Sequence, residues 1–368
     1  MNQEQTSKNR LLFLDVLRII AVSLVVYTHL FSCAMDANVL KNIVSGNDLP
    51  IFSMNFMYCF ENFLQKFLHT NPASIGVALF FIITGYLMPM MMERYARVEF
   101  LINRILRIFP TMIVATIIIG VFLYFLQNIT FSSSEYVSSW FLINYITHKT
   151  MITGVLWTLV VEVIFYFSCF LIGKFTLTKL LCFQIFILLT VLYGHWHVFP
   201  LCKFTMCILV GSAIYLSQHF NSIKKYSIIL LSLVFYIVAF RLAAHFEHYQ
   251  NYHYMISTHV IVILLFLSIQ YIFERFNVKD LSQEVIKNLS ELVYSIYLTH
   301  CSIGLAMLDR LRDYSVPIIL NYLLTVLLIA FCSFLLYKFV ETPSINLAKK
   351  IITKLRMRNV KCQIKRCF

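Results

Sequence analysis

Long apolar runs separated by short polar stretches limit what this chain can fold into more than any other feature. A helix needs about 20 mostly apolar residues to cross a bilayer. Only 13% of the residues are charged and 60% are hydrophobic, whereas roughly 25% of an average soluble domain is charged. The sequence therefore predicts an all-α, polytopic membrane helix bundle with about ten transmembrane helices. The predicted spans are residues 11–33, 73–92, 110–127, 154–173, 178–194, 199–217, 226–244, 254–273, 290–308 and 317–340.

Lys and Arg residues divide unevenly between the two sides of these spans. With the N-terminus in the cytoplasm, 21 of them fall on the cytoplasmic side and five on the other side. Cytoplasmic loops of membrane proteins carry such an excess of Lys and Arg. The pattern predicts that both termini are cytoplasmic. It also explains the net charge of +13 without a nucleic-acid partner.

The sequence outside the spans indicates a single membrane domain rather than several domains. We predict a membrane domain over residues 1–345 and a basic cytoplasmic tail over residues 346–368, which suits contact with anionic lipid headgroups. Residues 52–68 are amphipathic and aromatic. This pattern predicts a helix that lies in the membrane interface. Residues 136–147 are predicted to be a similar surface or re-entrant piece.

Three ionisable residues fall on one stripe of the first span. Asp15 and Arg18 are three residues apart and therefore neighbours on a helix. His29 follows Arg18 by eleven residues, which is close to three turns, or about 16 Å along the axis. Ionisable groups inside spans are costly and mark functional sites. The alternative is structural, because an interfacial ion pair and a histidine that bonds between helices also occur in membrane bundles.

Two further sets of polar residues are functional candidates. Glu162 lies among apolar residues in the fourth span, four residues before Tyr166, so the two share a helix face. Arg104 and Arg107 precede the third span and share a face, and Arg binds phosphate with a bidentate fork. The alternatives are that Glu162 pairs with a buried cation such as Arg18, and that the arginines only reflect cytoplasmic topology.

No metal site is predicted from the cysteines or histidines. The ten cysteines include no Cys-x-x-Cys pair. His245, His248 and His253 lie in one predicted loop, but they do not form a complete ligand set, and catalytic zinc normally takes three protein ligands.

Five segments in a fixed order carry a family resemblance. They are Leu14-Asp15-x-Leu17-Arg18 with His29; Gly76-Val77-x-Leu79-Phe80-Phe81-x-x-Thr84-Gly85-Tyr86-Leu87; Arg104-Ile105-x-Arg107-Ile108-x-Pro110; Trp157-Thr158-Leu159-x-x-Glu162-x-x-Phe165-Tyr166; and Tyr294-Ser295-Ile296-Tyr297-Leu298-x-His300, followed by Glu341-x-Pro343. With them the chain resembles the acyltransferase 3 family, integral-membrane acyltransferases that modify bacterial surface sugars. Thr84 and Thr158 stand where the family more often has Ser, which keeps the hydroxyl.

The resemblance implies an O-acyltransferase in the bacterial inner membrane. Its donor would be a cytoplasmic coenzyme A thioester, acetyl-CoA by default, and its acceptor a hydroxyl of a surface polysaccharide or lipid-linked sugar. Arg18, Arg104 and Arg107 would hold the coenzyme A phosphates. His29 would handle the acceptor proton or relay the acyl group, with Glu162 assisting it and Asp15 holding Arg18. The other site residues that the resemblance implies are Trp157, Tyr166, Tyr297 and His300.

Two other classes of function remain open at the level of sequence. Buried charges also suit a transporter or flippase for a lipid-linked glycan. Against this, the chain shows no inverted repeat and few Gly or Pro residues within its spans. A membrane protein that scaffolds a polysaccharide synthase is the third interpretation.

Overall fold

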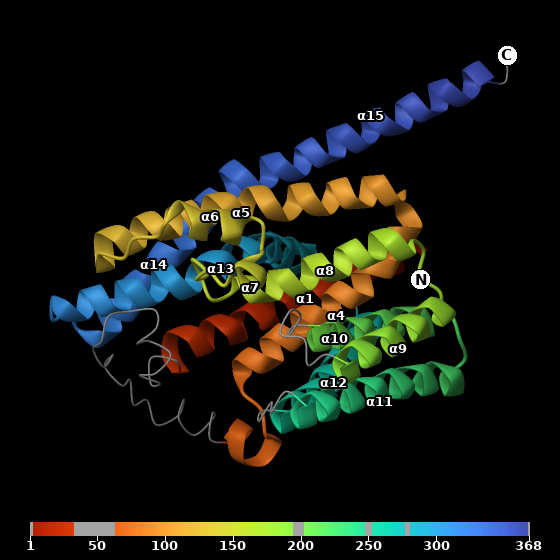
Figure 1. Ribbon diagram of the computed structural model, residues 1–368, viewed down its shortest axis with the longest axis horizontal. Coiled ribbons are helices and arrows are strands. Elements are labelled where there is room, and N and C mark those ends of the chain that lie inside the picture. The colour runs from red at the N-terminus through yellow and green to blue at the C-terminus, as the bar shows by residue number, and fades with distance from the viewer. Residues whose placement is uncertain (1–2, 33–62, 194–201, 247–251, 277–279, 367–368) are drawn as a thin grey trace.

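The computed structural model describes residues 3–32, 63–193, 202–246, 252–276 and 280–366, and within them every regular element is a helix (Figure 1). In chain order the elements are α1 (Gln3–Tyr27), the π-helix η1 (Thr28–Ser32), α4 (Pro72–Arg94), α5 (Arg97–Gln127), α6 (Ser133–Trp140), α7 (Asn144–Thr147), α8 (Leu156–Ile172), α9 (Leu177–Tyr193), α10 (Cys202–Ser217), α11 (Ser222–Phe246), α12 (Tyr252–Arg275), α13 (Asp280–Asp313), α14 (Ile318–Leu336), the π-helix η3 (Tyr337–Glu341) and α15 (Thr342–Arg366).

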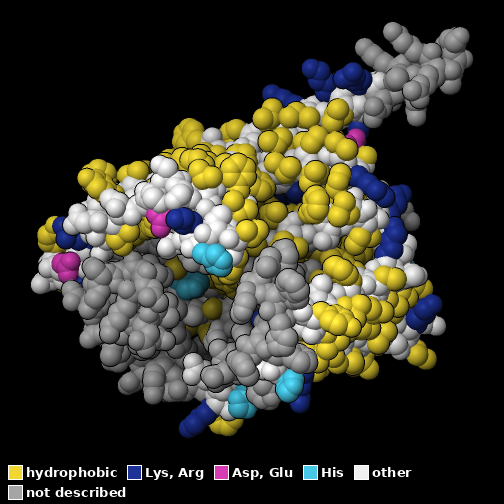
Figure 2. Space-filling model, viewed as in Figure 1, with side chains coloured by type: hydrophobic (Ala, Val, Ile, Leu, Met, Phe, Trp, Pro, Cys, Tyr) yellow, Lys and Arg dark blue, Asp and Glu magenta, His cyan; other side chains and the backbone are white. Residues whose placement is uncertain are grey.

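The predicted all-α membrane bundle is confirmed. Within the described ranges, seven helices are long and apolar enough to cross a membrane, and α8, α9 and α10 are shorter apolar helices. Each of the ten predicted spans overlaps one of these ten helices. Figure 2 shows hydrophobic side chains over much of the visible face, with Lys and Arg gathered along the right-hand edge and on α15. An apolar outer surface of this kind suits contact with lipid.

The segments outside the spans differ in how far the structure describes them. Most of the predicted interfacial helix, residues 52–68, lies outside the described residues, although residues 63–68 are helical. The predicted surface piece, residues 136–147, forms the end of α6 and the short helix α7. The predicted tail begins inside α15, which follows α14 and η3 without a break and packs against α5.

The ends of the helices are set by local sequence. Asn71 caps α4, since its side-chain oxygen accepts a hydrogen bond from the Ser74 backbone N–H (2.8 Å), and Pro72 opens the helix. Both residue types are favoured at these positions, where backbone N–H groups have no partner within the helix. α8 ends at Gly173, whose φ of 72° lies in the left-handed region that favours glycine.

The centre of the bundle is the crossing of α4 with α10, and α4 also packs against α1. Two glycines make the crossing close. A Cβ on Gly85 would lie 1.8 Å from the Ile208 carbonyl oxygen, and one on Gly211 would lie 2.1 Å from the Ile82 carbonyl oxygen. Small residues at such interfaces let helix backbones approach, which is a main source of packing energy in membranes.

We expect Gly85→Ala to destabilise the bundle, because the added methyl group meets backbone atoms that cannot move aside. Overpacking lowers the free energy of unfolding by about 1–3 kcal/mol even where side chains can adjust. For Gly85→Ala we expect a loss of about 3 kcal/mol or more, because backbone atoms cannot adjust in this way. The measurement is the thermal midpoint of the purified protein in detergent. Gly154→Ala is the matched control, since a Cβ there meets no atom of the described part of the chain within 4 Å. Equal midpoints for the two variants would contradict the close crossing.

Candidate active site

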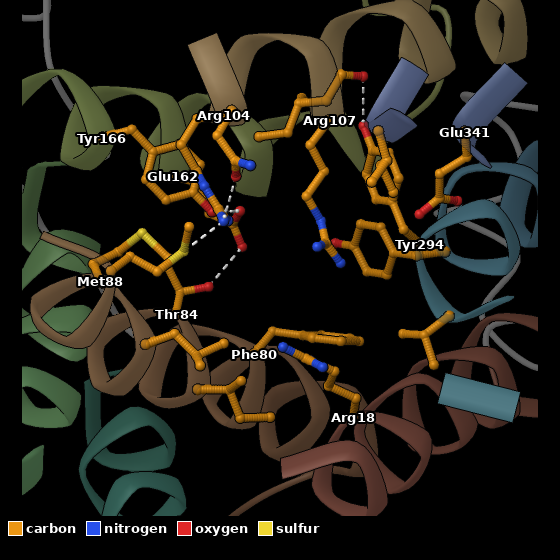
Figure 3. Close-up of a pocket in the computed structure, with 18 of the residues that line it drawn as sticks. Arg18, Phe80, Thr84, Met88, Arg104, Arg107, Glu162, Tyr166, Tyr294 and Glu341 are labelled. Atoms are coloured by element: carbon orange, nitrogen blue, oxygen red, sulfur yellow. Dashed lines mark hydrogen bonds between the residues drawn. The ribbon is translucent and has the colours of Figure 1, made fainter. Parts of the chain in front are cut away.

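A cavity of about 660 Å³ lies between α1, α4, α5, α8, α13 and α15. We call it the arginine cavity, because the side chains of Arg18, Arg104 and Arg107 line it and point into it (Figure 3). In this view Arg104 lies with Glu162, Tyr166 and Thr84 on one side, and Arg107 lies toward Tyr294 and Glu341 on the other. The structure therefore brings together the three arginines that the sequence separates by up to 89 positions.

The predicted pair of Asp15 and Arg18 is confirmed. Arg18 Nη1 lies 2.8 Å from Asp15 Oδ1, one turn away on α1. Ser290 Oγ on α13 donates a second hydrogen bond to the same carboxylate oxygen (2.7 Å). Asp15 itself does not line the arginine cavity, whereas Arg18 does. The carboxylate therefore holds the guanidinium in place from behind.

Arg104 is more buried than Arg18 and Arg107. It is only 8% exposed, and its Nη2 donates to Asn103 Oδ1 (3.0 Å) and contacts the Met91 sulfur. Its guanidinium carbon lies 5.7 Å from the centre of the Tyr166 ring. Among the residues that the structure describes, Arg104 Nε has no hydrogen-bond partner. A buried donor without a partner is costly, so this N–H is suited to an anionic ligand.

Glu162 lies in the arginine cavity beside Arg104 (Figure 3). Its carboxylate accepts hydrogen bonds from Tyr166 Oη (2.7 Å) and from Thr84 Oγ1 (3.2 Å). Tyr166, four residues along α8, thus contacts Glu162 as the sequence spacing predicts. The structure gives Glu162 no contact with His29, because His29 faces a different cavity.

This second cavity has a volume of about 260 Å³ and is lined by His29. We call it the histidine cavity. Trp157, Phe81 and Phe204 supply an aromatic lining, with the Trp157 and Phe204 rings 5.0 Å apart. His29 belongs to the π-helix η1, where α1 ends. π-Helical turns are rare and are frequent at functional sites.

A chain of hydrogen bonds orients the imidazole of His29. His300 Nδ1 lies 3.0 Å from the Ile296 carbonyl oxygen, which can only accept, so this nitrogen carries the proton. In a neutral His300 the other nitrogen, Nε2, is then an acceptor. His29 Nδ1 lies 2.9 Å from it and must donate. In a neutral His29 whose Nδ1 carries the hydrogen, Nε2 is unprotonated. The lone pair on Nε2 can therefore accept a proton from a substrate.

The two cavities lie toward opposite ends of α4. Ala73 and Ser74 in its first turn line the histidine cavity, and Arg94, its last residue, lines the arginine cavity. Between these ends, Val77, Phe81 and Tyr297 line both cavities. We call these three residues the shared wall.

Tyr297 is held in the shared wall by a hydrogen bond. Its hydroxyl lies 2.7 Å from Thr158 Oγ1, and Thr158 in turn donates to the Val155 carbonyl (2.9 Å). The Tyr297 hydroxyl therefore serves as the donor to Thr158. Phe80 packs edge-on against the Tyr297 ring, with centroids 5.4 Å apart. The Thr158 hydroxyl thus holds the Tyr297 side chain in place where it lines both cavities.

Sequence reasoning did not select several residues that the structure places at these sites. Glu341 lines the arginine cavity from the π-helix η3 and accepts a hydrogen bond from Ser295 Oγ (2.8 Å). Tyr294 lines the same cavity and donates to the Ile108 carbonyl (3.0 Å). The motif residues Glu341-x-Pro343 were the available signal for Glu341. Nothing in the sequence indicated that His300 would contact His29, because 271 positions separate them.

The residues that the structure describes contain no group of three or more His, Cys, Asp or Glu side chains suited to hold a metal ion. No curated protein and no solved structure matched the chain in our comparisons. One protein-family model, the acyltransferase domain of the acyltransferase 3 family, matches residues 11–338, nearly the whole chain. The chain therefore belongs to the acyltransferase 3 family, membrane enzymes that transfer acyl groups to hydroxyl groups of glycans and similar acceptors.

Proposed function

We propose that the protein moves an acyl group, acetyl by preference, from a coenzyme A thioester in the arginine cavity to a sugar hydroxyl in the histidine cavity. The acceptor is a polysaccharide or a lipid-linked sugar. The observation that carries this proposal is the pair of cavities toward opposite ends of α4, which meet at the shared wall. One offers cations to a phosphorylated donor, and the other offers an unprotonated imidazole nitrogen to a hydroxyl.

The arginine cavity suits coenzyme A in charge and size. Four arginines line it, Arg94 in addition to Arg18, Arg104 and Arg107, and the Arg104 Nε–H is available for a phosphate oxygen. Arg is the side chain best adapted to bind phosphate, through two parallel hydrogen bonds. The volume of about 660 Å³ falls in the usual range of about 300–1,000 Å³ for small-molecule sites.

The distribution of Lys and Arg supports a cytoplasmic opening for the arginine cavity. Arg94 and Lys349, which line this cavity, belong to the side of the chain that carries 21 of the Lys and Arg residues. This side is cytoplasmic by the positive-inside rule, and acyl-CoA thioesters are made in the cytoplasm. We therefore place the enzyme in a bacterial inner membrane with its donor site inside.

The histidine cavity suits a sugar. Trp157, Phe81 and Phe204 present flat apolar faces to the cavity, and aromatic rings of this kind pack well against the C–H face of a pyranose. Polar groups among an aromatic lining then fix the orientation of a ligand. His29 is one of the polar groups in this lining, together with Ser74, His259 and Tyr297.

The transfer step follows from the hydrogen-bond chain. His29 Nε2 takes the proton of the acceptor hydroxyl as its oxygen attacks the thioester carbonyl. The carbon–sulfur bond then breaks, and the imidazolium returns the proton to the departing thiolate. His300 holds His29 in the required tautomer, as the third member of a catalytic triad does. If the acyl group is first carried on His29, the same Nε2 is the atom that accepts it.

Glu162 and Asp15 act on the donor side in this proposal. Glu162 accepts a hydrogen bond from Tyr166, whose ring lies 5.7 Å from the Arg104 guanidinium carbon, and Asp15 holds Arg18 by an ion pair. Neither carboxylate contacts His29 through the hydrogen bonds described above. Their contribution is therefore to arrange the guanidinium groups that hold the donor.

We expect His29→Ala to abolish ester formation, because general-base catalysis is worth about 10²–10⁴-fold. The measurement is the base-labile O-acyl content of the host's surface polysaccharide at matched protein levels in the membrane. His219→Ala, on an exposed histidine after α10, should leave the ester unchanged. An unchanged ester in His29→Ala, with polysaccharide retained inside the cell, would instead indicate transport.

His300→Leu should lower kcat by roughly 10- to 100-fold with little change in KM, because a misoriented His29 impairs the transition state and not substrate binding. His300→Gln should retain more activity than His300→Leu, since its amide oxygen can still accept from His29 Nδ1. Both are measured as transfer of radiolabelled acetyl from acetyl-CoA in membranes. Equal kcat values for the two variants would argue against the hydrogen bond as the cause.

The double variant Arg104→Ala/Arg107→Ala should raise the KM for acetyl-CoA by at least about tenfold, because each lost charge-assisted bond contributes about 1.5–3 kcal/mol. The same membrane assay measures it. Arg310→Ala, a half-exposed arginine at the far end of α13, is the control for loss of positive charge. A double variant with normal donor KM would show that these arginines do not hold the phosphates.

A further inference from the structure

The C-terminal helix α15 forms one side of the arginine cavity. Ile345, Asn346 and Lys349 line it. Arg356 follows Lys349 by seven residues, which is close to two helical turns, so both lie on one face about 10 Å apart along the axis. In Figure 1, α15 runs beside α5. The helix that the sequence presents as a basic tail therefore contributes a continuous face to the site.

A two-pronged ion pair attaches this face to the start of α5. Arg356 Nε donates to Glu99 Oε1 (2.9 Å), and Arg356 Nη2 donates to Glu99 Oε2 (2.7 Å). Glu99 also accepts from the backbone N–H of Ala96, where it caps α5 (3.1 Å). Bidentate Arg–carboxylate pairs fix geometry as well as adding energy.

The same arginine also holds the segment between α4 and α5. Arg356 Nη2 donates to the Arg94 carbonyl (3.2 Å), and its guanidinium carbon lies 5.4 Å from the centre of the Tyr95 ring. Arg94 and Tyr95 both line the arginine cavity. One side chain thus connects three elements that surround the same end of the cavity. A pair that served only to anchor the tail would not need these additional contacts.

This end of the cavity is far from the reacting end. Phe81 in the shared wall and Arg94 are thirteen residues apart on α4, which corresponds to roughly 20 Å along a helix. Arg94 and Lys349 place two more cations here, in addition to Arg18, Arg104 and Arg107. The cavity is therefore long, with positive charge both along its length and at the end away from His29.

We propose that Lys349, Arg94 and Asn346 form a subsite for the nucleotide end of the donor, the adenosine 3′,5′-bisphosphate portion of coenzyme A, whereas Arg18, Arg104 and Arg107 hold the phosphate attached to the pantetheine arm. In this proposal Glu99 and Arg356 are positioning residues that hold α15 at the subsite. The inference rests on the proposed function, because it assigns the far end of the donor whose thioester lies at the shared wall. A thin donor whose phosphates extend from its far end to the start of the pantetheine arm, and whose thioester is uncharged, matches this distribution of cations.

The test compares two donors that differ only in the nucleotide. Acetyl-CoA carries it, and S-acetyl-4′-phosphopantetheine lacks it. Lys349→Ala should raise the KM for acetyl-CoA about tenfold, the size expected for one charge-assisted phosphate contact, and leave its kcat unchanged. The KM for the truncated donor should not change, which also shows that the variant is folded. Lys350→Ala, which removes the same charge from an exposed neighbour that does not line the cavity, should change neither value.

Arg356→Ala should raise the KM for acetyl-CoA and not the KM for the truncated donor, as Lys349→Ala does, although Arg356 is not part of the subsite. Arg356→Lys should fall between the wild type and Arg356→Ala, because an ammonium group keeps the charge but cannot reproduce the two-pronged pair. The assay is run in nanodiscs of neutral lipid and repeated with anionic lipid. A rise in the KM for acetyl-CoA alone, measured in neutral lipid, supports the subsite.

Three results would overturn the inference while leaving the proposed function intact. An unchanged KM in Lys349→Ala would show that Lys349 makes no contact with the donor. An equal rise in KM for both donors would show that α15 only supports the fold. A loss that appears only in anionic lipid would assign Lys349 to lipid headgroups. Failure of the proposed function is separate, since the wild type would then use neither donor.

Discussion

The cost of placing a charge or a polar group in an apolar bundle determines how this protein is arranged. A charged side chain at the centre of a bilayer costs about 2.5–3.5 kcal/mol even on the most lenient scale. The polar groups near the middle of the bundle therefore occur in sets. Asp15 lies with Arg18 and Ser290, Glu162 with Tyr166 and Thr84, and His29 with His300. Each set joins helices that are far apart in sequence, so the same bonds that satisfy the polar groups also specify the packing.

The sequence predicts the helices well and the contacts between them only in part. Hydropathy locates the spans because lipid imposes a minimum length on every apolar helix. The pairing of Asp15 with Arg18 and of Glu162 with Tyr166 is also accessible, because each pair lies within one helical turn. The contact between His300 and His29 cannot be predicted in this way. It depends on how α13 packs against α1, and no local spacing encodes a contact across 271 positions.

Regular helical spacing predicts only in part which cavity an ionisable side chain of a helix lines. The eleven-residue interval between Arg18 and His29 places them on one stripe only if the helix stays α-helical. The chain instead enters the π-helix η1 at Thr28, and His29 lines a different cavity from Arg18. A second π-helix, η3, presents Glu341 to the arginine cavity. Both irregular turns occur where an ionisable side chain lines a cavity, and a reading based on 3.6 residues per turn cannot foresee either.

The shared wall has an electrical consequence for the membrane around it. Moving one elementary charge through a potential of 100 mV releases about 2.3 kcal/mol, so any continuous aqueous path through the bundle would discharge the cell's energy supply. Val77 and Phe81 offer no polar side-chain atom, and the Tyr297 hydroxyl is bonded to Thr158. These three residues place two apolar side chains and one hydrogen-bonded hydroxyl between the arginine cavity and the histidine cavity. In the proposed reaction an acyl group crosses this wall in one direction and one proton crosses it in the other, so neither cavity gains or loses net charge.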